Sequence, residues 1–255
     1  MSAVLDHLAI GTHRLTDGWD LFGGVLGGTW AYGSDSPGFW WGQLAFAAGP
    51  KIELLTPTGG PDGAFLERFL AARGAGPHHL NFLVTDIEDM LARIRAFGLE
   101  PVGVNLANPY WREAFLPPRG AHGIVIQVAQ QGGGSPPPSA PPRELVSQGP
   151  PASFDLIEHR VGDLDGAVRL FRDVLDGQLS AAGDGTALVT WPGGKRIALV
   201  REDGLPLGGA LHHVRFARAS GASGASGASG AFGARERERA DVLARRLGLA
   251  VELAG

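Results

Sequence analysis

Apolar and polar side chains alternate in several short segments of the first half of the chain, as in strands that bury one face. In residues 4–11 the aliphatic side chains share one face, and His7 lies on the other. Residues 51–55 alternate in the same way and place Glu53 on their less apolar face. The pattern predicts two strands that each present one polar side chain away from the main apolar set.

The same arrangement recurs further along the chain. In residues 77–84 the apolar side chains alternate with His79, whereas His78 falls in register with the apolar set. Residues 123–130 then place Gln127 on the less apolar face of another predicted strand. Four polar side chains therefore lie on comparable faces of four predicted strands: His7, Glu53, His79 and Gln127. This is the outline of a four-ligand metal site built from a duplicated unit.

Helices and further strands complete each unit. Helices are predicted at residues 17–26, 62–72 and 86–97, with glycine after the first and the third, as is common at helix C-termini. Further strands are predicted at residues 39–47, 100–104 and 113–116. The order of elements predicts two βαβββ units, at about residues 3–57 and 77–130, and therefore an α+β fold.

Two glycine-rich stretches interrupt this order of elements. Residues 131–152 combine proline, which lacks an N–H donor, with glycine, whose ordering costs entropy, so neither a helix nor a strand is favoured. Residues 220–233 contain a Gly-Ala-Ser triplet repeat without bulky aliphatic side chains. We predict a domain at 1–130, a linker at 131–152, a second domain at 153–255, and a flexible loop at 220–233.

Beyond the predicted linker the first unit begins again, but its polar positions differ. Residues 154–177 loosely match the first strand and helix. Leu156 and Ala198 stand where the first half has its first two ligand candidates, whereas His213 corresponds to His79. Because the final module is also short, we predict a degenerate, C-terminally truncated domain that holds no complete metal site.

Composition and charge narrow the classes of partner. The chain of 255 residues has no cysteine, which excludes disulfides and thiolate metal ligands. Its net charge is −4 and its 22 basic residues are scattered, so no nucleic-acid partner is expected. No apolar run approaches the ~20 residues of a membrane span, and the N-terminus lacks the features of a signal peptide. We expect a soluble cytoplasmic protein, and a homodimer is compatible with these features.

Four segments carry a resemblance to a known superfamily: DHLAIG, KIELLTP, FLERFLAARGAGPHHLNFLVTDIEDMLARIRAFG and GIVIQVAQ. Over nearly all of residues 4–130 the chain resembles the vicinal oxygen chelate superfamily, which includes glyoxalase I, methylmalonyl-CoA epimerase, extradiol dioxygenases and bleomycin-resistance proteins. The similarity is greatest to the epimerase and glyoxalase I branch, at residues 64–98. The resemblance implies paired βαβββ modules in a cup-shaped mixed sheet. It also implies metal ligands on the first and last strands of each module, at His7, Glu53, His79 and Gln127.

The same resemblance implies one divalent metal ion, such as Zn, Co, Ni or Mn, and a small carbonyl substrate that chelates it. A carboxylate is usual at the last ligand position of the family, where this chain has Gln127. Because an amide is a poor proton acceptor, another residue must serve as the base. Glu53 and His122 are the candidate catalytic residues, and Glu113 is a third candidate.

Three functions stay open from the sequence. Proton-transfer chemistry by a glyoxalase-like or epimerase-like lyase or isomerase is preferred. An Fe(II) extradiol-type dioxygenase is an alternative, because His7, His79 and Glu53 form a set of two histidines and one carboxylate. A non-catalytic protein that binds or sequesters a small molecule, such as an antibiotic, is the third, because the usual base is missing. Four aromatic side chains are candidates to line a pocket for an apolar substrate: Trp40, Trp41, Tyr110 and Trp111.

Overall fold

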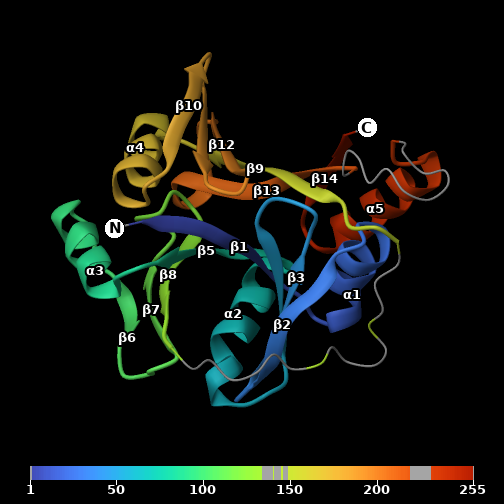
Figure 1. Ribbon diagram of the computed structural model, residues 1–255, viewed down its shortest axis with the longest axis horizontal. Helices are drawn as coiled ribbons and strands as arrows, with labels where there is room; N and C mark the ends of the chain where they lie inside the picture. Colours follow the sequence, from blue (N-terminus) through green and yellow to red (C-terminus); the bar gives the residue numbers. More distant parts are fainter. Residues whose placement is uncertain (1, 134–139, 141–144, 146–148, 219–230, 255) are drawn as a thin grey trace. The chain divides into compact units, whose positions relative to one another are not determined.

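Two mixed β-sheets dominate the computed structural model, which describes residues 2–133, 140, 145, 149–218 and 231–254 (Figure 1). The eight strands of the first sheet, sheet A, are β1 (Ala3–Gly11), β2 (Thr29–Ser36), β3 (Phe39–Ala45), β4 (Lys51–Pro57), β5 (Gly76–Val84), β6 (Val102–Asn105), β7 (Trp111–Leu116) and β8 (Val125–Gln131). Their order is β2-β3-β4-β1-β5-β8-β7-β6. The first and last strands of each βαβββ module, β1 with β4 and β5 with β8, therefore occupy the four central places.

The helices of the first half follow the predicted order, with two local differences. They are α1 (Leu15–Trp19), which continues as the π-helix η1 (Asp20–Val25), the short η2 (Pro61–Gly63) with α2 (Ala64–Arg73), and α3 (Ile87–Ala96). The helix predicted at 17–26 is thus partly a π-helix. The first strand after it, β2, was not predicted. The side chain of Asp86 accepts hydrogen bonds from two backbone N–H groups of the first turn of α3, as N-cap residues do.

The second half repeats the first with fewer strands. Sheet B contains six strands: β9 (Ser153–Val161), β10 (Gln178–Gly183), β11 (Thr186–Trp191), β12 (Lys195–Arg201), β13 (Gly209–Ala217) and β14 (Ala250–Ala254). Its order is β10-β11-β12-β9-β13-β14. The helices are α4 (Leu164–Arg169), continued by the π-helix η3 (Leu170–Val174), then η4 (Pro206–Gly208) and α5 (Ala234–Arg246). The passage from α-helix to π-helix recurs after the first strand of each half, which supports an internal repeat.

By its contacts the chain divides into two compact units that do not coincide with its two halves. One unit comprises residues 1–8, 79–137 and 157–211. Within it the ring of Phe82 lies 6.2 Å from that of Phe171 and 5.4 Å from that of Trp191, measured between centroids. The module of β5–β8 therefore packs on the module of β9–β12 in this unit.

The other unit comprises residues 9–78, 138–156 and 212–255. Its aromatic core includes Phe154, stacked on Phe216 at 4.5 Å between ring centroids, and Phe46 at 5.0 Å from Phe216. The last helix, α5, packs against α1 and η1 in the same unit. Each unit thus combines one module of the first half with one module of the second.

The α+β class, the paired modules in a curled mixed sheet, and a second domain of the same kind are confirmed. Much of the predicted linker and most of the loop predicted at 220–233 lie outside the described residues, so the domain boundaries stay a prediction. Among the residues that the structure describes, no helix has both the length and the apolar character needed to cross a membrane.

Candidate metal centre

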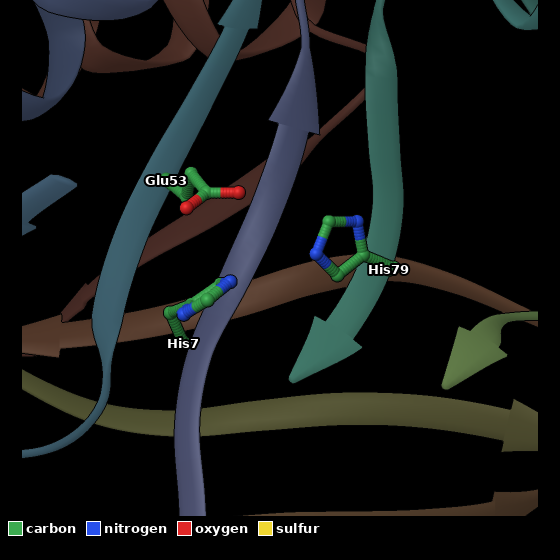
Figure 2. A group of neighbouring side chains, drawn as sticks. All are labelled: His7, Glu53 and His79. Atoms are coloured by element: carbon green, nitrogen blue, oxygen red, sulfur yellow. The ribbon is translucent and has the colours of Figure 1, made fainter. Parts of the chain in front are cut away.

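Three of the predicted metal ligands come together on sheet A. His7 on β1, Glu53 on β4 and His79 on β5 each offer a nitrogen or oxygen atom, and these atoms all lie within 4.8 Å of one another. Figure 2 shows the two imidazole rings and the carboxylate pointing toward one another from neighbouring strands. All three side chains are buried, with exposed fractions of 1%, 7% and 5% for these residues. The strand order explains the cluster, since β4, β1 and β5 are adjacent in the sheet.

The cluster has the donor set and the size that a divalent ion requires. Two imidazole nitrogens and one carboxylate oxygen suit Zn, Co, Ni and Fe(II). Ligand atoms at ~2.0–2.2 Å from one ion lie at most ~4.4 Å from each other. The donor atoms all lie within 4.8 Å of one another, which is close enough for the three side chains to converge on one ion. The three side chains therefore fit a divalent metal.

Neighbouring side chains orient two of the three ligands. The carboxylate of Asp6 accepts a hydrogen bond from Nδ1 of His7 at 2.8 Å, which assigns Nε2 as the coordinating nitrogen. Gln43 on β3 lies opposite Glu53 in the register, and its Nε2 donates to Glu53 Oε2 at 2.8 Å. Partners of this kind hold metal ligands in one orientation before an ion binds.

Gln127, the fourth predicted ligand, is held at both ends of its amide. It lies on β8 opposite Asn81 of β5, and its Oε1 accepts a hydrogen bond from Asn81 Nδ2 at 2.7 Å. Its Nε2 donates to Glu113 Oε2 on β7, also at 2.7 Å. An amide oxygen has a second lone pair, so coordination by Gln127 is compatible with these bonds and stays a prediction.

The second catalytic candidate, His122, lies elsewhere. It occupies a turn with a φ of 53°, and its ring approaches Gly166 at the start of α4. Burial lowers the pKa of His122, against the opposing effect of the Asp163 carboxylate. His122 is not part of the cluster of His7, Glu53 and His79, and its catalytic role stays a prediction.

His78 differs from its neighbour His79 in its surroundings. Its ring packs edge-on against Phe65 at 5.5 Å and Phe69 at 4.8 Å, both on α2. Burial lowers the pKa of His78 to about 4, so the imidazole is neutral at neutral pH. The two phenylalanine rings thus give His78 apolar surroundings.

The candidate aromatic residues occupy different places. Trp41 shares the face of Gln43 and Glu53, because partners in an antiparallel pair point the same way, and its ring lies 5.1 Å from that of Tyr32. Trp40 alternates to the other face, where it lies 5.9 Å from Trp30. Tyr110 is 49% exposed, and Trp111 donates to Glu113 Oε2 at 2.9 Å.

Sequence reasoning missed Asp6 and Tyr32. Strand alternation assigns Asp6 to the face opposite His7, so no signal in the pattern points to their hydrogen bond. Tyr32 lies on β2, a strand that the sequence did not predict.

Comparison with known proteins supports the superfamily assignment. Residues 6–115 match the model of the Glyoxalase/Bleomycin resistance protein/Dioxygenase superfamily. No curated protein matches the sequence.

Several solved structures are similar. A triple mutant of 4-hydroxymandelate synthase from Streptomyces coelicolor has a TM-score of 0.59 at 14% identity, covering 85% of this chain and 71% of that chain. A hypothetical protein from Staphylococcus aureus has a TM-score of 0.60 at 13% identity, covering 88% and 94%. Methylmalonyl-CoA epimerase from Mycobacterium tuberculosis is 24% identical, with a TM-score of 0.45 and coverage of 50% and 87%.

At these identities the first two structures show that the fold is shared over most of the chain. The matched segment contains His7, Glu53 and His79. Over residues 6–115, the chain is similar to the Glyoxalase/Bleomycin resistance protein/Dioxygenase superfamily.

Proposed function

We propose that this protein is a metal-dependent enzyme that transfers a proton at the carbon next to a carbonyl group, as a lyase or isomerase acting on a small molecule. The observation that carries the proposal is the buried cluster of two imidazoles and one carboxylate at His7, Glu53 and His79. A buried carboxylate beside two imidazoles is costly unless a positive charge accompanies it. A divalent ion at this position supplies that charge.

The protein side chains have distinct roles in this proposal. His7, His79 and Glu53 hold the ion, and Gln127 completes the set through its amide oxygen. When bound, the ion supplies Lewis-acid polarisation of a carbonyl oxygen. Glu53 is the only carboxylate of the set, and it would take the substrate proton on a carboxylate oxygen that does not hold the ion.

The surroundings of Glu53 support its role over that of His122. Gln43 donates to one carboxylate oxygen of Glu53, Oε2, and so fixes the plane of the group. The imidazole of His122 faces Gly166, outside the ligand cluster. Trp41 and Tyr32 extend along the face of sheet A that carries Glu53, which suits a substrate with an apolar part.

Exchange of substrate hydrogen with solvent tests this proposal. The metal-loaded protein is incubated in heavy water with 2-oxoaldehyde thiol adducts and 2-methyl-branched acyl-CoA thioesters, and deuterium incorporation is measured. Glu53→Gln retains an oxygen ligand but loses the base, so exchange is expected to fall ~10²–10⁴-fold while part of the metal binding remains.

The matched control for this experiment is Glu88→Gln, which changes an exposed carboxylate on α3. The control is expected to exchange at the wild-type rate. Unchanged exchange in Glu53→Gln would remove Glu53 from the mechanism. No exchange with any substrate of the panel, in a protein that binds metal, would favour a protein that sequesters a small molecule.

A second candidate function rests on the composition of the cluster. Two histidines and one carboxylate without a fourth protein ligand are the set that Fe(II) oxygenases use. Anaerobic loading with Fe(II), followed by measurement of O₂ consumption with a panel of catechols, tests an extradiol-type dioxygenase. Catechol-dependent O₂ uptake that is lost in His79→Ala would support the dioxygenase over proton transfer.

A further inference from the structure

Each module of sheet A contains a side-chain hydrogen bond between its last strand, which carries a predicted ligand, and the next strand toward the edge of the sheet. In the first module Gln43 on β3 donates from Nε2 to Glu53 Oε2 on β4 at 2.8 Å. In the second module Gln127 on β8 donates from Nε2 to Glu113 Oε2 on β7 at 2.7 Å. The carboxylate lies on the inner strand in the first module and on the outer strand in the second. Gln43 is directly opposite Glu53, whereas Glu113 is opposite Ala129 and reaches Gln127 diagonally.

Glu113 determines which way the amide of Gln127 points. Its Oε2 accepts hydrogen bonds from Gln127 Nε2 and from Trp111 Nε1, the latter at 2.9 Å. A carboxylate can only accept, so the nitrogen of the Gln127 amide must face Glu113 and the oxygen must face away. That oxygen meets Nδ2 of Asn81 at 2.7 Å, which in turn sets the orientation of the Asn81 amide.

The series of hydrogen bonds from Glu113 through Gln127 ends at a buried oxygen, Oδ1 of Asn81. Asn81 is fully buried on β5, on the same strand face as His79. Within the described part of the chain, its Oδ1 has no hydrogen-bond partner. Buried polar atoms of native proteins are nearly always paired, so an unpaired oxygen next to a ligand histidine points to a donor supplied by a bound molecule.

We propose that Glu113 is a positioning residue that orients the amides of Gln127 and Asn81. In this series of hydrogen bonds, Gln127 presents its oxygen as the fourth ligand. Asn81 presents Oδ1 to a hydroxyl or N–H donor of the substrate. The part that concerns the ion rests on the proposed function, whereas the orientation of the two amides is a property of the protein itself.

Substitutions of Glu113 separate orientation from charge. Glu113→Leu has a similar size but no acceptor, so it releases the amide of Gln127. Glu113→Gln keeps an acceptor oxygen with two lone pairs and is expected to retain the orientation. Trp111→Phe, the matched control, removes the other donor to the same oxygen and leaves the bond to Gln127 in place.

The first measurement needs no metal. In the metal-free full-length protein, the side-chain NH₂ signals of Gln127 and Asn81 are assigned by their loss in Gln127→Glu and Asn81→Asp. These signals are expected to exchange slowly with solvent in the wild type, in Glu113→Gln and in Trp111→Phe. Rapid exchange is expected in Glu113→Leu. Slow exchange in Glu113→Leu would overturn the proposal.

The second measurement is the affinity for Co²⁺, by calorimetry and by the visible spectrum of the Co²⁺-loaded protein. Loss of a residue that orients a metal ligand commonly weakens binding ~10–100-fold, and this is the effect expected for Glu113→Leu. Glu113→Gln and Trp111→Phe are expected within about threefold of the wild type, because both keep the hydrogen bond to Gln127. Equal losses in Glu113→Leu and Glu113→Gln would overturn orientation as the role of Glu113.

A reciprocal exchange provides an independent check. Gln127→Glu alone brings two carboxylates together where the wild type has a hydrogen bond of 2.7 Å. The double variant Glu113→Gln/Gln127→Glu restores one donor and one acceptor, with the carboxylate on the inner strand as it is at Glu53. It is expected to bind Co²⁺ more tightly than Gln127→Glu alone, and the opposite order would contradict the proposal. Absence of Co²⁺ binding by the wild type would refute the proposed function, whereas the exchange measurement still decides the orientation of the amides.

Discussion

The adjacent histidines of β5 offer a direct test of the metal centre. His79 belongs to the ligand cluster, whereas His78, one residue earlier, packs on α2. Replacing each by alanine removes the same side chain from the same strand. We expect His79→Ala to lose metal binding with a modest effect on the metal-free protein. His78→Ala is expected to keep metal binding but to destabilise the metal-free protein.

The magnitudes follow from the contacts. The ring of His78 meets two phenylalanine rings at 5.5 and 4.8 Å, and such aromatic pairs contribute about 0.5–1.5 kcal/mol each. His78→Ala is therefore expected to lower the free energy of unfolding by about 1–3 kcal/mol. An ion present at about 100 times its Kd stabilises the folded protein by ~2.7 kcal/mol. For a chain of this size, that stabilisation raises Tm by about 5–10 °C.

The assay is thermal unfolding of chelator-treated protein, titrated with Zn²⁺, Co²⁺, Ni²⁺ and Mn²⁺, and with Fe²⁺ under anaerobic conditions. Wild type and His78→Ala are expected to show the same metal-dependent rise in Tm from different starting values. His79→Ala is expected to show none. A full metal-dependent rise in the Tm of His79→Ala would refute His79 as a ligand. If only His78→Ala lost the metal-dependent rise in Tm, the ion would be bound by His78 instead.

Three further predictions follow. A chain ending at residue 130 is expected to bind metal but to be less stable and less soluble than the full chain. The reason is that the buried ring of Phe82 loses its contacts with Phe171 and Trp191. A soluble, well-folded fragment that binds no metal would contradict this prediction. Burial lowers the pKa of His122 in the folded protein, so its contribution to stability is present above its ordinary value of 6.5 and declines as pH falls below it. His122→Asn, which tolerates the positive φ, is expected to reduce the difference between urea unfolding at pH 8 and at pH 5. Asp176→Asn weakens the ion pair with Arg93, 2.6 Å long and about a quarter exposed, and is expected to cost about 1 kcal/mol by urea unfolding.

Several features of the fold were predictable because they depend on local periodicity. Alternation with a period of two identifies β1, β4, β5 and β8 and the polar side chain of each, since a strand turns successive residues to opposite faces. The strand β2 escaped prediction because it lies at the edge of sheet A, carries a polar sequence and contains an irregularity between Trp30 and Tyr32. Edge strands bury less of their surface, so their sequences alternate less clearly.

The arrangement around the candidate site depended on the tertiary structure. The sequence placed Gln127 on the expected face, but only the register of β8 beside β5 and β7 brings its amide to Asn81 and Glu113. The turn at His122 directs that imidazole to Gly166 rather than to the ligand cluster. Local periodicity states which face a side chain occupies, whereas hydrogen bonds between strands depend on which residues the sheet places next to one another.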